Sequence, residues 1–216
     1  MTTTQASQKS LSQLTETTTK KFKSKFKKNK NNKFIANTSA ELHKDLDITV
    51  SYIQKNSGLT FDCKAGCVHC CVHSRVVHVL PSEAFYMVNQ LKARLTELEI
   101  DGLIKALKIR SETPEDGDFT CVFLKKGICS VYDIRPFTCR RHHSLDVEDC
   151  LPKGIYPPEV SKSADLEDLA SAQIAGYMSA LETIHFSTIP IDLTQALLKV
   201  FTDPKAEQRC KKGLPL

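Results

Sequence analysis

Residues 63–71 read CKAGCVHCC, which places the thiols of Cys63, Cys67, Cys70 and Cys71 within nine positions. Thiolates are both nucleophiles and ligands for soft metals, so a cluster of this density indicates either a metal site or disulfide bonds. The other cysteines of the chain are Cys121, Cys129, Cys139, Cys150 and Cys210. We therefore expect the middle of the fold to be organised by whatever these sulfur atoms bind.

The amino-terminal residues favour a metal over disulfides. Residues 1–14 contain no apolar segment of signal-peptide length, and no stretch of the sequence is apolar enough to form a transmembrane segment. We therefore expect a cytoplasmic protein, and disulfides are rare in that reducing compartment. The same cysteine spacing in a cytosolic chain points to metal binding, with redox chemistry or buried structural thiols as the alternatives.

Positive charge is confined to one end of the sequence. The 216 residues carry a net charge of +5, yet residues 1–34 hold nine lysines and one glutamate, so the rest of the chain is net negative. Because this end has few apolar residues, we expect residues 1–36 to form a disordered lysine-rich arm. Phe22, Phe26 and Phe34 lie among the lysines and would suit an anionic partner, either nucleic acid or an acidic surface, although a solvated tail without a partner is the commoner explanation.

Apolar residues recur at helical spacing through much of the remaining sequence. The predicted helices cover 39–57, 82–98, a shorter segment around 103–107, 165–186 and 192–201. Ser39, Ser82 and Asp192 are the expected caps of three of these helices.

Two short apolar segments predict strands. Residues 76–80 favour a strand that ends at Pro81, and Gly127 lies in a turn that would join 121–124 to 128–132 as a hairpin. The expected fold is therefore mainly α with a small β-hairpin, its helices packed around an irregular cysteine-rich metal-binding core. One domain would span 37–203, followed by a polar C-terminal tail over 204–216.

The cysteine cluster has a second interpretation. On an ideal helix the four thiols of 63–71 would share an arc of about 100°, which describes a buried stripe of small side chains. Gly66 and the lack of long apolar neighbours favour a metal-binding turn instead. One tetrahedral zinc or one iron–sulfur cluster needs four thiolates, so eight candidates allow two sites, or one site with spare thiols. The metal candidates are Cys63, Cys67, Cys70, Cys71, Cys121, Cys129, Cys139 and Cys150, with His69, His73, His78, His142 and His143 in reserve.

Neither the metal nor its charge balance follows from the thiols alone. Thiolate ligands suit zinc and iron–sulfur clusters alike. Four thiolates leave a divalent zinc with a net charge of −2, and Arg135 and Arg140 lie close to the candidate ligands in sequence. These two arginines are the candidates for binding an anionic cofactor or balancing the thiolates.

Three stretches give the sequence a family resemblance: residues 61–71, with their four cysteines, residues 80–84, which read LPSEA, and residues 121–140, which include CSVYDIRPFTCR. In this order they are similar to the YkgJ-type cysteine-cluster proteins, bacterial proteins described as chelating zinc or iron. The resemblance covers about residues 60–150. It implies that Cys63, Cys67, Cys70, Cys71, Cys121, Cys129 and Cys139 form the metal site. The first gap of the cluster holds three residues instead of two, which bears on the role of Cys63.

The resemblance leaves more than one function open. Flagellin lysine N-methylase looks like it shares the cysteine module, which implies an alternative: an iron–sulfur-dependent protein methyltransferase. The eight glycines form no Gly-x-Gly or phosphate-loop pattern that would support a common nucleotide site. A nucleic-acid-binding adaptor acting through the lysine-rich arm is the third possibility. The leading expectation is a cytosolic metal-binding protein that holds zinc or an iron–sulfur cluster.

Overall fold

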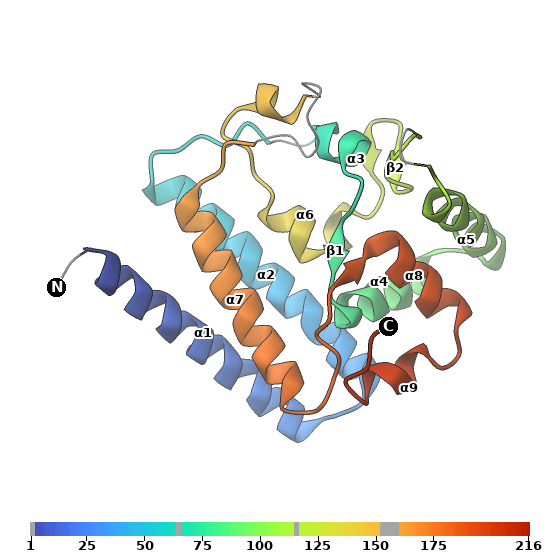
Figure 1. Ribbon diagram of the computed structural model, residues 1–216, viewed down its shortest axis with the longest axis horizontal. Coiled ribbons are helices and arrows are strands. Elements are labelled where there is room, and N and C mark those ends of the chain that lie inside the picture. The colour runs from blue at the N-terminus through green and yellow to red at the C-terminus, as the bar shows by residue number, and fades with distance from the viewer. Residues whose placement is uncertain (1–2, 64–65, 115–116, 152–159) are drawn as a thin grey trace.

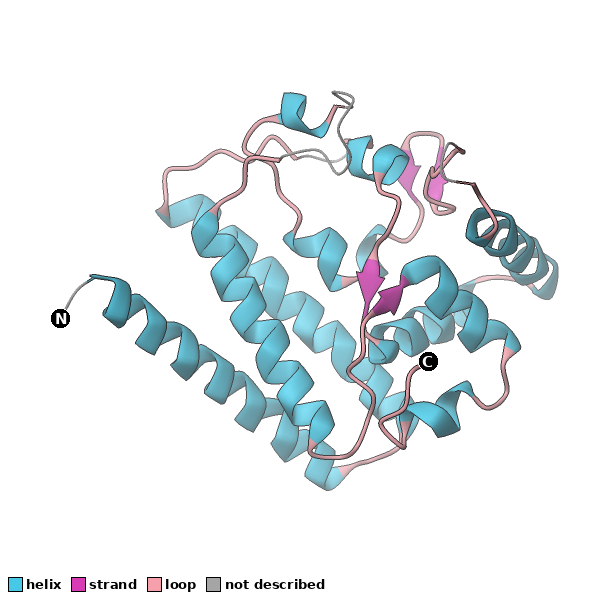
Figure 2. Ribbon diagram, viewed as in Figure 1, coloured by secondary structure: helices cyan, strands magenta, loops and turns pink. Residues whose placement is uncertain are grey.

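The computed structural model describes residues 3–63, 66–114, 117–151 and 160–216, and side chains from Gln8 onward. Helices dominate this part of the chain, and the strands are short (Figures 1 and 2). The α-helices are α1 (Thr3–Lys28), α2 (Asn32–Asn56), α3 (His69–His73), α4 (Pro81–Arg94), α5 (Glu97–Ser111), α6 (Phe137–Arg141), α7 (Ala164–Glu182), α8 (Leu193–Thr202) and α9 (Ala206–Cys210). Two 3-10 helices, η1 (Tyr132–Ile134) and η2 (Val147–Cys150), and strands β1 (His78–Val79), β2 (Leu124–Lys125), β3 (Ile128–Cys129) and β4 (Ile191–Asp192) complete the set. The prediction of a mainly α fold with a small hairpin is confirmed.

The prediction of a disordered arm over 1–36 is wrong, because most of this segment is helix α1. Phe22 and Phe26 are spaced one helical turn apart and are 0% exposed, and the Phe22 ring and the Tyr177 ring of α7 pack edge to face, with their centres 4.7 Å apart. Gly176 allows the close approach, since a Cβ atom there would lie 2.5 Å from the carbonyl oxygen of Thr15. The low apolar content of the segment did not predict this helix. A few aromatic side chains on one face are enough to fold it, because α7 offers a matching apolar surface.

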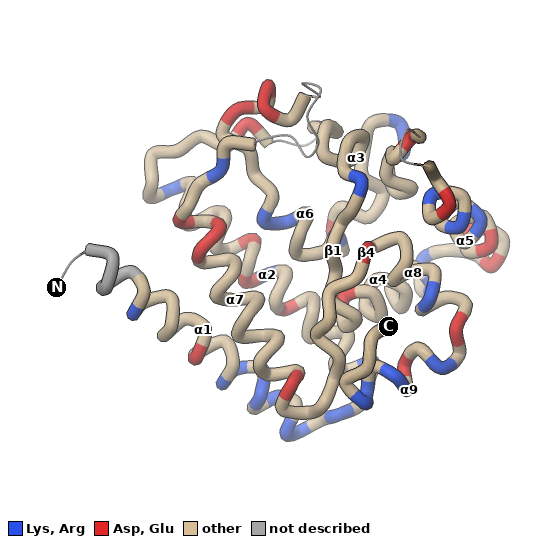
Figure 3. The backbone as a smooth tube through the Cα atoms, viewed as in Figure 1, with Lys and Arg blue, Asp and Glu red and all other residues tan. Residues whose placement is uncertain are grey.

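The lysines of α1 point outward while its aromatic residues point inward. Figure 3 shows basic residues gathered where α1 ends and α2 begins. Lys21 and Lys25 pair with Asp45 and Glu41 of α2 at 2.5 and 3.1 Å. The burial of Phe22 and Phe26 excludes base stacking by these two rings, whereas Phe34 is only partly buried.

Several helix ends differ from the prediction. Helix α2 begins at Asn32, capped by the Asn31 side chain, while the expected cap Ser39 lies buried inside the helix near the Tyr177 hydroxyl. Thr96 caps α5 and separates it from α4, which leaves Leu98 82% exposed and outside the expected apolar stripe. A good capping box overrode the apolar periodicity at this point.

The hairpin and the final long helix are as expected. Strands β2 and β3 pair Leu124 with Cys129, and the two turn residues, Lys126 and Gly127, both have positive φ. Asp192 caps α8 by accepting hydrogen bonds from the backbone N–H groups of Thr194 and its neighbour. Strand β1 forms but finds its partner in β4, a pairing across more than a hundred residues that local patterns do not reveal.

The carboxyl-terminal segment belongs to the core, which corrects the expected polar tail over 204–216. Cys210 of α9 and Leu216 are buried, and the Lys199 ammonium donates to the Leu216 carbonyl oxygen at 2.6 Å. No helix within the described residues combines the length and apolar character that crossing a membrane requires.

One buried carboxylate joins three helices. Glu83 is 0% exposed and accepts hydrogen bonds from the backbone N–H of Leu80 at 3.1 Å, where α4 begins, and of Phe137 at 2.8 Å, where α6 begins. His43 Nε2 of α2 lies 2.6 Å from the same carboxylate. Helix α6 is further fastened to α2 by Arg140 and Asp47, 2.5 Å apart.

Replacing Phe22 tests whether α1 belongs to the folded core. We expect Phe22→Ala to lower the free energy of unfolding by about 3 to 5 kcal/mol, because the change opens a cavity against Tyr177. Urea denaturation followed by circular dichroism measures the loss, with the exposed Lys23→Ala as the control. A Phe22→Ala protein as stable as the control would show that α1 does not dock on α7.

Replacing Glu83 tests the junction of α2, α4 and α6. We expect Glu83→Gln to lower the free energy of unfolding by about 1 to 3 kcal/mol, because the side-chain amide has only one oxygen and leaves at least one buried N–H donor without its acceptor, and to speed the reaction of Cys139 with a thiol reagent. Glu97→Gln, at an exposed glutamate in the first turn of α5, should change stability by less than about 0.5 kcal/mol. Equal stability of the two variants would contradict the role given to Glu83.

Candidate metal centre

Segments far apart in the sequence bring their cysteines to one cavity of about 380 Å³. The cysteines that line it are Cys63 and Cys67 before α3, Cys70 and Cys71 in α3, Cys121 and Cys129 around the hairpin, and Cys139 in α6. Seven of the eight candidate thiols therefore line a common space. All nine cysteines of the chain are free thiols.

Backbone contacts hold the first pair of distant segments together. The Asp62 N–H donates to the Ser144 carbonyl oxygen at 3.0 Å, and the Ser144 N–H donates to Cys63 Sγ at 3.1 Å. The Asp62 carboxylate in turn accepts from the Val147 N–H, at the start of η2. The segment before Cys63 is thereby tied to the segment that leads to Cys150.

A second set of contacts brings α3 to the hairpin. The Cys121 N–H donates to the Cys71 carbonyl oxygen at 2.7 Å, and the Ser130 N–H donates to the Phe123 carbonyl oxygen at 2.9 Å. With the β2–β3 pairing, these bonds place Cys121 and Cys129 beside the carboxyl end of α3. Cys139 joins them from α6, whose first turn is held by Glu83.

Burial changes the protonation of the thiols. It raises the pKa of Cys63, Cys121, Cys129 and Cys139, so these groups are protonated at neutral pH while no cation is present. The exception is Cys70, because a hydrogen bond from the Cys71 thiol lowers its pKa to about 7. A metal would therefore have to displace protons from most of its thiol ligands.

The two candidate arginines lie in different places. Arg135 lines the cysteine cavity, with its guanidinium carbon 3.7 Å from the centre of the Tyr132 ring, and its charge lowers the pKa of Cys70. Arg140 is buried and gives its hydrogen bonds to Asp47 and to the carbonyl oxygens of Asp133 and Arg135. Arg140 is therefore a structural residue outside the cavity, whereas Arg135 can balance thiolate charge.

Two of the reserve histidines also reach the cavity. His142 and His143 line it, and burial lowers the pKa of both, that of His142 to about 4. Both rings are therefore neutral at pH 7, the form that binds metals. These two histidines directly follow Cys139 and two arginines, and nothing in the sequence indicated that they face the cavity. The other reserve histidines, His69, His73 and His78, do not line it.

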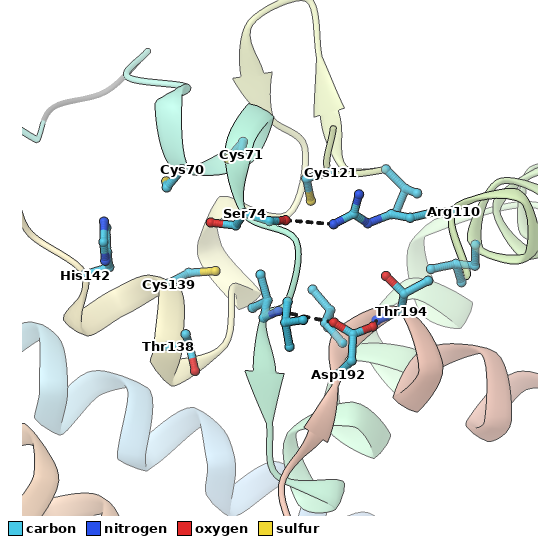
Figure 4. A pocket seen from close by; sticks show the side chains of 15 residues that line it. Cys70, Cys71, Ser74, Arg110, Cys121, Thr138, Cys139, His142, Asp192 and Thr194 are labelled. Carbon is cyan, nitrogen blue, oxygen red and sulfur yellow. Dashed lines mark hydrogen bonds between the residues drawn. The ribbon is translucent and has the colours of Figure 1, made fainter. Parts of the chain in front are cut away.

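A second, smaller cavity of about 80 Å³ adjoins the first and shares four of its cysteines and His142 (Figure 4). Its two charged groups, Arg110 and Asp192, are already engaged. The Arg110 guanidinium donates to the carbonyl oxygens of Ser74 and Phe119, and Asp192 accepts from the Val77 N–H at 3.2 Å. The small cavity thus extends the space beside the thiols without adding a free charged group.

The thiol groups are chemically suited to bind a metal, but the distances between them are longer than a bound metal requires. Among the described residues, no three His, Cys, Asp or Glu side chains stand close enough together to hold a metal ion as they are placed. The main cavity, at about 380 Å³, is much larger than one cation. Soft donors on every side of such a space suit zinc or iron, and binding would draw the sulfur atoms inward.

The last two cysteines are buried in different surroundings. Cys150 is 6% exposed and does not line the main cavity, and burial raises its pKa while the nearby Ser144 side chain lowers it. Cys210 lies in α9 and takes part in neither cavity, as expected.

Comparison with known proteins agrees with this arrangement. Neither the curated proteins nor the solved structures compared with the chain gave a match. One family model matches residues 62–172, and its description reads "CxxCxxCC: Putative zinc- or iron-chelating domain". The matched segment runs from the residue before Cys63 into α7 and so contains all eight candidate cysteines. Because the match covers half of its length, the chain belongs to the CxxCxxCC family.

Proposed function

We propose that the protein binds zinc or an iron–sulfur cluster through the thiolates of the cysteine cavity. The observation that carries the proposal is the convergence of seven thiols, from before α3, from α3, from the hairpin and from α6, on one space. Packing alone does not explain thiols from so many segments, because one or two small apolar side chains would fill the space equally well. Soft metals do require such a set.

The surroundings of the thiols support metal binding over a thiol–disulfide function. A redox pair of the thioredoxin type needs two cysteines and a strand–turn–helix context, whereas Cys67 precedes and Cys70 lies in a helix of only five residues, with five further thiols around them. Arg135 supplies a positive charge at the cavity wall, and His142 and His143 are neutral. These groups favour the binding of an ion by several thiolates.

The bound metal would act chiefly as a structural link. The elements that carry the thiols are short: α3 and α6 have five residues each, and strands β2 and β3 have two. Elements of this size do not hold a fold by themselves. A structural zinc contributes about 10 to 16 kcal/mol of apparent binding free energy. This is enough to hold together the short elements that carry the thiols, α3, the β2–β3 hairpin and α6 with the segments next to them, which we call the cysteine layer.

The first test of this function is metal content. We expect full-length protein purified without oxygen to contain zinc, or iron with labile sulfide, and Cys63→Ser/Cys129→Ser to lose at least about nine-tenths of it, since each site needs most of its thiolates. Cys210→Ser, which changes a buried thiol outside the cavity, is the matched control and should keep the metal. Wild-type protein without metal, or a double variant that retains it in full, would refute the proposal.

The second test is removal of the metal. We expect a chelator to abolish the protection of backbone amides against hydrogen exchange in α3 and in residues 121–131, while α2, α4 and α7 keep most of theirs, because those helices pack through their own apolar faces. Hydrogen exchange with mass spectrometry resolves the two regions. Unchanged protection in α3 and in residues 121–131 would show that the metal does not stabilise these segments.

A further inference from the structure

Positive charge is concentrated on the surface where α1 ends and α2 begins. Residues 17–40 contain eight lysines and no aspartate or glutamate. Figure 3 shows basic residues gathered there, at the end of the molecule opposite α3 and the β2–β3 hairpin in Figure 1. We propose that the exposed part of residues 20–33, which we call the lysine surface, binds the sugar–phosphate backbone of a nucleic acid without reading its base sequence. The inference goes beyond the proposed metal-binding function and does not rest on it.

The packing of α1 determines where its lysines point. The rings of Phe22 and Phe26 pack against Tyr177 of α7, so the lysines before, between and after them lie on the other sides of the helix. Lys23 and Lys27 are one turn apart, and neighbouring side chains at this spacing have Cβ atoms about 5 to 6 Å apart. The lysines thus form a row along the helix, which suits a polyanion whose charges also repeat along a line.

Most of these lysines have no acidic partner in the fold. Lys21 and Lys25 pair with carboxylates of α2, and Lys20 pairs with the exposed Glu16. The other lysines of the surface are exposed and form no ion pair with any residue that the structure describes: Lys23, Lys27, Lys28, Lys30 and Lys33. Their charges are therefore available to an external anion.

Several of these charges act against the stability of the helices. A helix favours acidic residues in its first turn, where the backbone dipole is positive, yet the first turn of α2 contains Lys33 and no acidic residue. Like charges one turn apart, such as Lys23 and Lys27, also destabilise a helix. The lysines in the last turn of α1 do match the dipole of their own helix. Because folding alone does not favour the whole set, its charges point to an external partner.

The turn between α1 and α2 adds neutral hydrogen-bond donors to the surface. The Asn29 side-chain oxygen accepts the Asn31 N–H at 2.8 Å, and the Asn31 side-chain oxygen accepts the Lys33 N–H at 2.9 Å. These bonds hold the turn and leave the side-chain N–H groups of both exposed asparagines without a partner among the described residues. Lysine and asparagine are among the side chains that contact phosphates in nucleic-acid complexes.

Two other anionic partners fit the lysine surface less well. An anionic membrane binds helices that insert an apolar face, but Phe22 and Phe26 are buried. Protein interfaces are depleted of lysine and centred on apolar side chains, and no large apolar side chain of residues 8–47 is exposed. Phe34 is packed against the core, so the expected contacts are to phosphates rather than to bases.

Binding to labelled duplexes tests the proposal. We expect full-length protein purified without oxygen to bind short fluorescent duplexes, of DNA or of RNA, irrespective of their base sequence, and to lose affinity steeply between about 50 and 200 mM salt. Fluorescence anisotropy measures the affinity, and comparison of the two duplexes identifies the preferred backbone. Lys23→Gln/Lys27→Gln/Lys30→Gln should weaken binding at least about tenfold and make the plot of log affinity against log salt less steep by about 3, since each lysine accounts for about one released counterion.

The matched control is Lys55→Gln/Lys105→Gln/Lys108→Gln, which removes three exposed lysines from the far end of α2 and from α5 and changes the net charge equally. It should keep the wild-type affinity, and both variants should unfold at the wild-type urea concentration, which separates lost binding from lost folding. Equal weakening by the two variants would overturn the proposal. Tighter binding of the wild type to phosphatidylserine vesicles or to polyglutamate than to the duplexes would also overturn it, and so would wild-type protein that binds neither duplex, whatever the variants do.

Discussion

The carboxylate of Glu83 is the contact on which the position of the cysteine layer depends. It lies without exposure to solvent between His43 of α2 and the first backbone N–H groups of α4 and α6. A buried charge is tolerated only where its hydrogen bonds are made, so the three elements must keep their relative positions for the fold to exist. Helix α6 carries Cys139, and one wall of the cavity is therefore fixed by the helical scaffold.

The other walls depend on weaker connections. The segment of Cys63 and the hairpin are joined to their neighbours by single backbone hydrogen bonds, each contributing about 0.5 to 1.5 kcal/mol net, and by few buried side chains, such as Phe61 and Phe123. The long helices α1, α2 and α7 bury aromatic and aliphatic side chains against each other, whereas the cysteine layer has few apolar residues of its own. The molecule thus divides into a region stabilised by apolar burial and a region whose order is expected to come from a metal.

The sequence predicted the elements whose causes are local. The positive φ at Gly127, the Asp192 cap and the apolar stripe of α7 each depend on residues within one or two turns of the chain. It missed α1, strand β4 and the burial of Cys210, which depend on surfaces distant in sequence. A lysine-rich segment has no core of its own, so only the surface around Tyr177 explains why it folds.

The candidate site shows the same limit. The sequence identified a set of thiols and named both Arg135 and Arg140, of which only Arg135 lines the cavity, and it left His142 and His143 in reserve. The side chains of adjacent residues leave the backbone in different directions, and which of them faces the cavity depends on how α6 sits on α2. That orientation is fixed by Glu83 and Asp47, both distant from the cysteine motif.

The division of labour between scaffold and thiols also bears on metal affinity. Bringing Cys63 and Cys150 together closes a long loop, which lowers the conformational entropy of the chain. In an unfolded chain, the free energy of metal binding alone would have to offset this entropic cost. Here the helices bring the segments together first, so this part of the cost is offset by apolar burial. What remains for the metal is to displace protons from buried thiols and to draw the sulfur atoms inward. A helix as distant from the cysteines as α1 thereby contributes to the affinity of the centre, because it stabilises α7 and the arrangement that α7 supports.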